Sequence, residues 1–240
     1  LRFAASSDGV HFEPTRASPI GAAGAPSLSW RDGRYWLAHT VLVRSGLLGR
    51  PTPTAVALRT SERLEGWSPP TEVLVPASPV FGPGRFVSDP ALLDHAGGTR
   101  LYVGAGRVEG QPPISRTLAV ADAPSPFGPY VVAPQPVLEP GRPGAMPDEV
   151  AVGQQRLVEL DDGLVSLGFS ALRGGGSRFT VRALGEGGAR PVRPAPELPA
   201  PARAVGSSAV CFFRGTWGLY GALSGPKIPF RHSIFRHRLV

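Results

Sequence analysis

The sequence predicts an all-β fold made of repeated four-stranded units. Its 31 Gly and 28 Pro are spread along 240 residues, which favours many tight turns and therefore many short strands. No stretch has the 3.6-residue period of a long amphipathic helix. A unit of about sixty residues recurs along the chain, and repeated four-stranded units are typical of a β-propeller.

The first half of the unit contains a short apolar strand, a turn, and a strand rich in aromatic or aliphatic residues. The four copies begin with APSLSWRDGRYWLAHT, DPALLDHAGGTRLYVGAG, EVAVGQQRLVELDDGLVSLGFS and SSAVCFFRGTWGLYGAL. Their first residues, Ala25, Asp89, Glu149 and Ser207, are 64, 60 and 58 residues apart. This regular spacing indicates blades of a propeller rather than a β-sandwich.

The second half of the unit supplies a third strand, a small polar turn with an aromatic residue, and a fourth strand. Residues 54–76 and 116–140 follow this pattern, 178–188 and 232–240 are weaker copies of the third strand, and 1–20 resemble the end of an earlier unit. We therefore predict one five-bladed propeller domain, residues 1–240, with an incomplete first blade. The predicted blades are 1–20, 21–80, 81–142, 143–200 and 201–240. A four-bladed ring closed by the N-terminal strand is the alternative.

The composition excludes several classes of protein. Hydrophobic residues make up 42% and charged residues 18%, which is a globular composition. The net charge is +7, but Lys227 is the only lysine and the arginines are scattered singly, so no nucleic-acid partner is expected. No apolar run is long enough to cross a bilayer, and no membrane partner is expected. The single cysteine, Cys211, excludes an intrachain disulfide.

Two of the four repeat positions just ahead of a first strand hold acids, Asp89 and Glu149. The first strand of a propeller blade lines the central channel, so we expect these side chains to converge near one mouth of it. Cleavage of a glycosidic bond needs two carboxyl groups that face each other across a bound sugar. The alternative is that each acid serves a turn before a strand. Other acids are predicted to be turn residues only: Asp8, Asp32, Asp94, Asp161 and Asp162.

Several segments resemble glycoside hydrolase family 43, a family of five-bladed propeller glycosidases. GAPSLSWRDGRYWLAHT is similar to the second-blade signature of that family, and SDPALLDHAGGTRLYVGAG to its third-blade strand pair. VADAPSPFGPYVVAPQPVL resembles the phrase before an outer strand, and PDEVAVGQQRLVELDDG the fourth blade. The resemblance covers most of the chain and implies a carbohydrate substrate.

The resemblance also implies roles for individual acids. Family members use a base on blade one, an Asp on blade three that tunes the pKa of the general acid and orients the substrate, and a general-acid Glu on blade four. By position, Asp89 corresponds to the Asp of blade three and Glu149 to the general acid. Asp148 is one residue out of register with the general acid. The base is expected some 60 residues before Ala25, upstream of Leu1, so the chain as given is expected to lack it.

Three residues are candidates for substrate binding: Trp36, His39 and Ser207. An aromatic ring binds sugar only where its face is open to the channel, and packing inside the blade is the alternative for Trp36. The same packing is expected for Trp30, Tyr35 and Tyr102, and a structural turn role for Trp67 and Phe127. No cofactor or metal is expected. A channel calcium or sodium ion remains an alternative, although Ser207 and Ser208 stand where relatives often carry a His.

The leading hypothesis is a glycoside hydrolase, or a fragment of one, that cleaves a pentose- or hexose-containing oligo- or polysaccharide with inversion. A propeller that binds carbohydrate without turnover is the second hypothesis, since many functions share this fold. A related enzyme of specialised metabolism or a phosphorolytic glycosidase is the third, and it would need an Arg or His cluster for phosphate. The compartment stays open, with an extracellular or periplasmic location slightly favoured over a cytoplasmic one.

Overall fold

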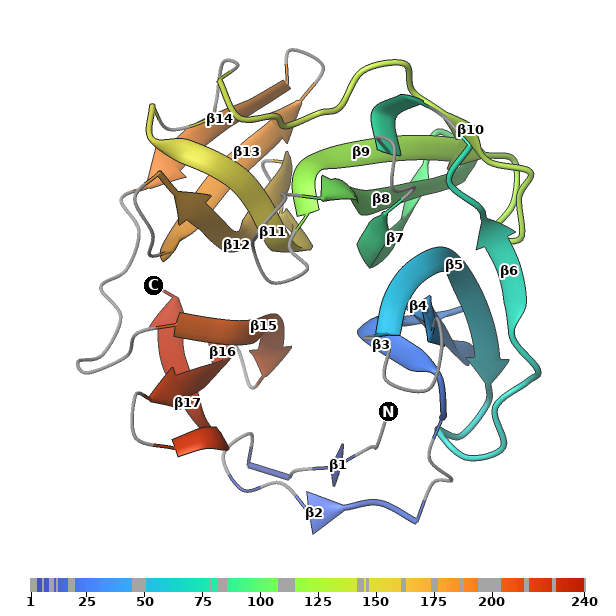
Figure 1. The fold of residues 1–240 in the computed structure, drawn as a ribbon. Helices are drawn as coiled ribbons and strands as arrows, with labels where there is room; N and C mark the ends of the chain where they lie inside the picture. Colours follow the sequence, from blue (N-terminus) through green and yellow to red (C-terminus); the bar gives the residue numbers. More distant parts are fainter. Residues whose placement is uncertain are drawn as a thin grey trace. The chain divides into compact units, whose positions relative to one another are not determined.

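The computed structural model contains almost only antiparallel β-strands (Figure 1). The described residues are 4–5, 7–8, 11, 13–16, 20–44, 51–77, 79–81, 86–107, 115–141, 145, 147–160, 163–173, 177–185, 188–193, 204–213, 216–225 and 228–239. Side chains are described for only part of these residues. Beyond residue 190 only the backbone is described. The chain divides into two compact units, Leu1–Pro136 and Val137–Val240. Each unit is described by itself.

The first unit holds a two-stranded sheet and two four-stranded sheets. The small sheet pairs β1 (Ala4–Ala5) with β2 (Glu13–Pro14). The next sheet has the order β3 (Ala23–Arg31), β4 (Arg34–Arg44), β5 (Pro51–Ser61) and β6 (Thr71–Leu74). After the short 3₁₀ helix η1 (Pro79–Phe81), the third sheet follows with β7 (Val87–His95), β8 (Gly98–Arg107), β9 (Ser115–Ala123) and β10 (Val131–Val132).

The second unit holds two more antiparallel sheets. One has the order β11 (Glu149–Leu160), β12 (Gly163–Leu172), β13 (Ser177–Gly185) and β14 (Gly188–Arg193). The other has the order β15 (Ala204–Phe213), β16 (Thr216–Gly225) and β17 (Ile228–Leu239). In every sheet the strands follow in chain order, so the first strand lies at one edge. The all-β class predicted from the repeats is confirmed. Among the described residues, three sheets have the predicted four antiparallel strands, and the sheet of β15, β16 and β17 has three.

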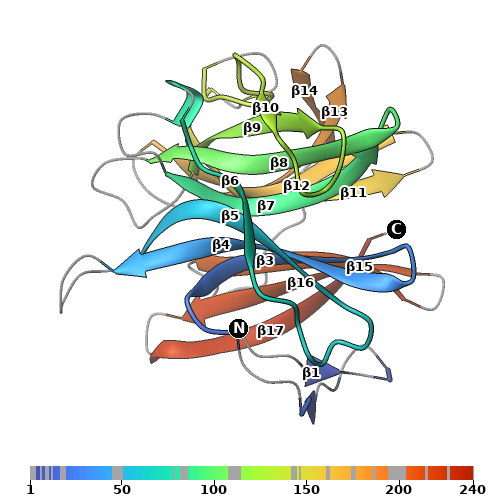
Figure 2. The same cartoon turned by 90° about the vertical axis from the view of Figure 1, so that its right-hand side faces the viewer.

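The core of the first unit lies between its two larger sheets. β7 lies against β3, β4 and β5 (Figure 2). Apolar side chains from both sheets form one buried cluster, for example Val56 and Leu58 of β5 with Leu101 and Val103 of β8. In β5 the run Ala55–Leu58 is buried on both faces, as expected for a strand covered on both sides. This packing holds the first strand of the third sheet, and with it Asp89, in a rigid environment.

Two hairpins use the turn chemistry that the sequence indicated. Asp32 and Gly33, between β3 and β4, have φ values of 48° and 72°. Ala96 and Gly97, between β7 and β8, have φ values of 45° and 78°. Positive φ at both central residues is the geometry of the type I′ hairpin, which Asp-Gly favours. The structural turn role predicted for Asp32 is confirmed.

Candidate active site

The residues aligned as repeat equivalents lie at breaks in the pairing between the first and second strands. In β3 the register shifts between Gly24 and Ser27, and in β7 between Ser88 and Ala91. In both, two residues of the first strand, Ala25-Pro26 or Asp89-Pro90, therefore oppose a single residue of the second, which is a β-bulge. The repeat inferred from the amino-acid sequence thus corresponds, in these two sheets, to a repeated β-bulge.

The two bulges share an unusual backbone conformation. Ala25 has φ 43° and Asp89 has φ 49°. Positive φ disfavours residues with a side chain, although Asp adopts it more readily than Ala does. Strained backbone that persists inside packed structure is concentrated at functional sites. Asp89 therefore shares with Ala25 a strained backbone position that the packed structure maintains.

Asp89 is a buried acid, with 9% of its surface exposed. The Ser88 hydroxyl, itself buried, donates a hydrogen bond to Asp89 Oδ2 at 2.8 Å. Burial of a carboxylate costs free energy unless the group is hydrogen-bonded, and this contact supplies one such hydrogen bond. It also fixes the rotamer of the acid relative to the bulge.

Glu149 opens β11 and stands directly before a second kind of register break, between Glu149 and Ala151. Glu149 as a whole is 5% exposed, and its side chain is 0% exposed. Arg182 Nη2 donates to Glu149 Oε1 at 2.7 Å, and the Arg182 side chain is 1% exposed. A comparable break in β15 falls between Val205 and Ser207.

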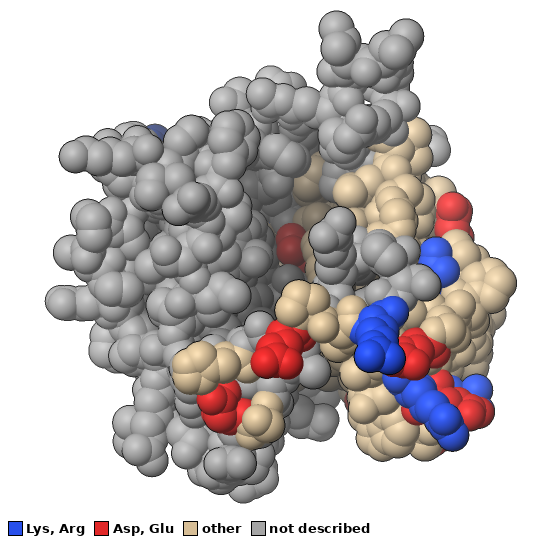
Figure 3. All heavy atoms as spheres, turned by 90° about the horizontal axis from the view of Figure 1, so that it is seen from below, with Lys and Arg blue, Asp and Glu red and all other residues tan. Residues whose placement is uncertain are grey.

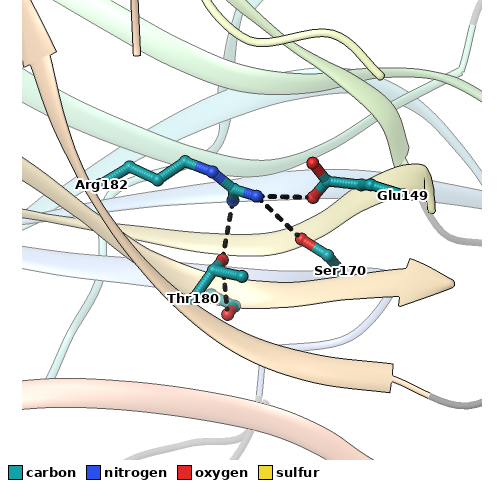
Figure 4. A network of polar contacts seen from close by, with 5 residues as sticks. Glu149, Ser170, Thr180 and Arg182 are labelled. Atoms are coloured by element: carbon teal, nitrogen blue, oxygen red, sulfur yellow. Dashed lines mark hydrogen bonds and ion pairs between the residues drawn. The ribbon is translucent and has the colours of Figure 1, made fainter. Parts of the chain in front are cut away.

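Arg182 sits at the centre of a buried polar network that draws on three neighbouring strands (Figure 4). Its Nη1 donates to Thr180 Oγ1 at 2.7 Å, and its Nη2 lies 3.4 Å from Ser170 Oγ. The Thr180 hydroxyl in turn donates to the Gly168 carbonyl at 3.2 Å. The guanidinium is therefore anchored on β12 and β13 while it bonds the acid of β11.

The sequence of β12 makes room for this long side chain. Ser166, Gly168 and Ser170 alternate with Leu167 and Phe169, so the small residues share one face of the sheet. In the register, Ser166 pairs with Arg182 and Gly168 with Thr180. The Arg182 side chain can thus cross β12 over small residues to reach β11, two strand spacings or about 10 Å away. Arg182 was not among the residues predicted from the sequence, because the S-x-G-x-S alternation points to it only once the register opposite T-x-R is known.

The Arg182–Glu149 contact is a buried ion pair. Burial lowers the pKa of Arg182, and the charge and hydrogen bond of Glu149 oppose that shift. The guanidinium nevertheless keeps its proton, since arginine starts with a pKa above 12. A charged donor makes a shorter and stronger hydrogen bond to a carboxylate than a neutral donor does. Glu149 thus faces a fixed positive charge, whereas the Ser88 contact of Asp89 comes from a neutral hydroxyl.

Trp36 lies in the core of the first unit, with 8% of its surface exposed. Its ring packs against Phe127, with ring centroids 5.4 Å apart and planes tilted by 49°. These surroundings match the packing alternative for Trp36, and its sugar-binding role stays a prediction. Trp30 differs, because it is 56% exposed and contacts Tyr35 edge-on at 4.5 Å.

His39 is buried in β4, opposite the Ala25-Pro26 bulge. Its Nδ1 donates to the Thr40 carbonyl at 3.2 Å, and Arg59 Nε donates to its Nε2 at 3.4 Å. Both contacts suit the neutral ring with the proton on Nδ1. Burial lowers the pKa of His39, and the Arg59 charge lowers it further, against the hydrogen bond to Thr40. The structure thus presents His39 as a neutral, hydrogen-bonded residue, and its substrate-binding role stays a prediction.

The remaining candidates are placed as follows. Ser207 lies in β15, and its side chain is outside the described residues. Asp148 is exposed, unlike Glu149. Asp94 accepts a hydrogen bond from Arg31 Nη1 at 2.6 Å, which joins the end of β3 to β7. Asp161 and Asp162 lie outside the described residues.

Charged side chains are mixed on the described surface. On the face drawn in Figure 3, the described basic side chains lie next to acidic ones. Arg100 makes a bidentate ion pair with Asp122, at 2.6 and 2.8 Å. Among the described residues, no group of three or more His, Cys, Asp or Glu could hold a metal ion. No helix in that part of the chain is both long and apolar enough to span a bilayer.

Comparison with solved structures identifies the fold. An α-L-arabinofuranosidase from Clostridium thermocellum is 18% identical, with a TM-score of 0.61 over 90% of this chain and 68% of its own. A family 43 protein of the xyloglucan locus of Bacteroides ovatus is 17% identical, with a TM-score of 0.65 over 100% of this chain and 47% of its own. An exo-β-1,3-galactanase from Phanerochaete chrysosporium, in complex with β-1,3-galactotriose, is 13% identical, with a TM-score of 0.62 over 89% and 47%.

The chain therefore spans about two thirds of the first of these structures and about half of the other two. No family model matches the chain, and no curated protein sequence matches it. The similarity is one of fold, at identities too low to carry a reaction across. The fold of this chain is that of the family 43 glycoside hydrolases, which are β-propellers.

Proposed function

We propose that the chain is the propeller, or part of the propeller, of a glycoside hydrolase, with Glu149 as proton donor and Asp89 as the residue that orients the donor and the sugar. The observation that carries the proposal is that two acids, sixty residues apart at equivalent positions of the sequence repeat, are both buried in or beside register breaks in the first strands of two sheets. The family 43-like fold supports it, because that architecture gathers the first strands of successive blades around one channel.

The proposed chemistry is single displacement with inversion. Glu149 protonates the leaving oxygen while a carboxylate base activates water on the other face of the sugar, and the two carboxyl groups must stand roughly 6.5–9.5 Å apart to admit that water. In the family that the sequence resembles, the base is a third acid, so neither Asp89 nor Glu149 takes that role. Five blades with an incomplete first one is the arrangement that this proposal requires.

The proposed substrates are pentose- or hexose-containing oligosaccharides. Among the structural neighbours, one is an arabinofuranosidase and another a galactanase bound to galactotriose. Aryl α-L-arabinofuranosides and aryl β-D-galactosides are therefore the first probes to try.

The test is hydrolysis of these aryl glycosides by the full-length protein and two matched variants. Glu149→Gln should lower kcat/KM by about 10²- to 10⁴-fold, which is the usual contribution of a general acid. Asp148→Asn, which changes the exposed neighbour, should retain most of the activity. Equal losses in both variants, or no turnover by the wild-type protein, would overturn the proposal.

One observation favours a second candidate, a propeller that binds carbohydrate without turnover. A general acid must present its proton to the substrate, yet the Glu149 side chain is 0% exposed and paired with Arg182. Binding of galactotriose or arabino-oligosaccharide with no product formed, measured by calorimetry and chromatography, would support this candidate over the first.

A further inference from the structure

In the Arg182 network, both terminal nitrogens of the guanidinium donate hydrogen bonds to buried side chains. The two terminal nitrogens of the guanidinium have different partners, Thr180 for Nη1 and Glu149 for Nη2. Two such contacts fix both the position and the plane of the guanidinium. The plane of the guanidinium then determines where Glu149 Oε1 lies, since the hydrogen bond is strong only near the N–H direction.

Stability alone does not account for this arrangement. A buried ion pair loses the hydration of both charges, and replacement by well-packed apolar residues is often neutral or stabilising. To make room for Arg182, a buried face of β12 carries small or polar residues in place of larger apolar ones: Ser166, Gly168 and Ser170. What the network does supply is a single orientation of one carboxyl group at the start of β11.

We propose that Arg182 is a positioning residue for Glu149, an inference that rests on the proposed function. Because the Nη2–H group donates to Oε1, the guanidinium fixes the direction in which the carboxyl group of Glu149 faces. During the reaction the O–H bond of Glu149 breaks as the glycosidic C–O electron pair moves to the leaving oxygen, which takes the proton. Glu149 becomes a carboxylate beside the Arg182 charge, and their attraction grows as the proton leaves.

This role has a kinetic signature that loss of folding does not produce. A leaving group that departs readily as an anion, such as 2,4-dinitrophenolate, needs little protonation, whereas phenolate needs much more. A residue that acts through the general acid should therefore matter for phenyl glycosides and hardly at all for dinitrophenyl glycosides of the same sugar. A purely structural residue should affect both substrates equally.

The experiment compares kcat for phenyl and 2,4-dinitrophenyl glycosides in the full-length protein and its Arg182→Met, Arg182→Lys and Glu149→Gln variants. Arg182→Met should lower kcat on the phenyl substrate by at least about 10-fold, while the change on the dinitrophenyl substrate stays within about 3-fold. Arg182→Lys, which keeps the charge but loses the planar fork, should recover part of that loss. Arg182→Met in the Glu149→Gln background should cause little further loss.

Arg100→Met is the matched control, because it removes an arginine that pairs with a carboxylate, Asp122, outside the network. It should leave the ratio of the two substrates unchanged. If Arg182→Met lowers both substrates equally, or additively with Glu149→Gln, the inference is overturned while the proposed function stands. If the wild-type protein hydrolyses neither substrate, it is the proposed function that fails.

Discussion

Asp89 and Glu149 both stand at register breaks in the first strands of their sheets, Asp89 inside a bulge and Glu149 directly before a shift. The contacts around them differ. Ser88, the neighbour of Asp89 in the chain, donates to it from a neutral hydroxyl. Glu149 is held by a guanidinium from two strands away. The backbone repeat therefore sets where an acid stands, whereas the residues across the sheet set the charge that it faces. Equivalent positions of the sequence repeat thus present their acids to different donors.

The largest effect should come from breaking the charged side of this comparison. Arg182→Met leaves a buried carboxylate without its counter-charge, which should lower the free energy of unfolding by about 3–5 kcal/mol. Ser88→Ala removes one neutral donor and should lower it by only about 1 kcal/mol. Urea unfolding of the two variants measures both values. Equal losses would show that the two acids are held in the same way.

His39 tests whether the unit that contains Asp89 also depends on a buried neutral group. Because burial lowers the pKa of His39 in the folded state, the unfolded state binds the proton more readily. Stability is therefore complete above the unfolded pKa of about 6.5 and falls, by at most about 1.4 kcal/mol per pH unit, as the pH decreases toward the folded pKa. His39→Gln should flatten this part of the pH–stability curve, and an unchanged slope would contradict the assignment.

The two bulges of the first unit offer a comparison at constant backbone. Ala25→Gly relieves a positive φ at the expense of a more flexible unfolded chain, and should raise the free energy of unfolding by up to about 1 kcal/mol. Asp89→Gly relieves the same strain but also loses the Ser88 hydrogen bond. Its gain in the free energy of unfolding should therefore be about 1 kcal/mol smaller than that of Ala25→Gly. Thermal unfolding resolves the difference. A larger gain for Asp89→Gly would mean that the contacts of Asp89 do not stabilise the fold.

The smallest effect is expected at the exposed arginine–carboxylate pair. Arg100 holds the pKa of Asp122 below its usual range through their hydrogen bonds. Both side chains are partly exposed, so water and salt screen the pair. Asp122→Asn should therefore lower the free energy of unfolding by less than about 1 kcal/mol, and less still in 1 M salt. A loss as large as that in Arg182→Met would show that burial is not what distinguishes the two pairs.

The sequence was sufficient to predict the sheets and the special position at the start of their first strands. The alignment of Ala25 with Asp89 identified them as equivalent positions, because the proline that follows each residue and the spacing of the units are local features of the sequence. The structure adds that both positions lie in a bulge. Arg182 could not be found in this way. Its contact with Glu149 depends on the register of three strands, and the sequence of residues 178–188 indicates only a weak third strand.

The surroundings of individual side chains were also harder to predict than the backbone. Trp36 and His39 were placed on the correct strand, but their burial depends on what packs against them. Phe127, more than ninety residues from Trp36 in the chain, supplies part of that packing. Local sequence could not reveal which aromatic faces the neighbouring sheet covers.

The central proposal is that Asp89 and Glu149 act on one substrate although they belong to different sheets. Measurement of kcat/KM on an aryl glycoside for Asp89→Asn, Glu149→Gln and the double variant tests it directly. Residues that act as a unit are strongly non-additive, so the double variant should be within about 10-fold of the worse single variant. Losses that simply multiply, or a single variant with unchanged kcat/KM, would show that the two acids do not share a site.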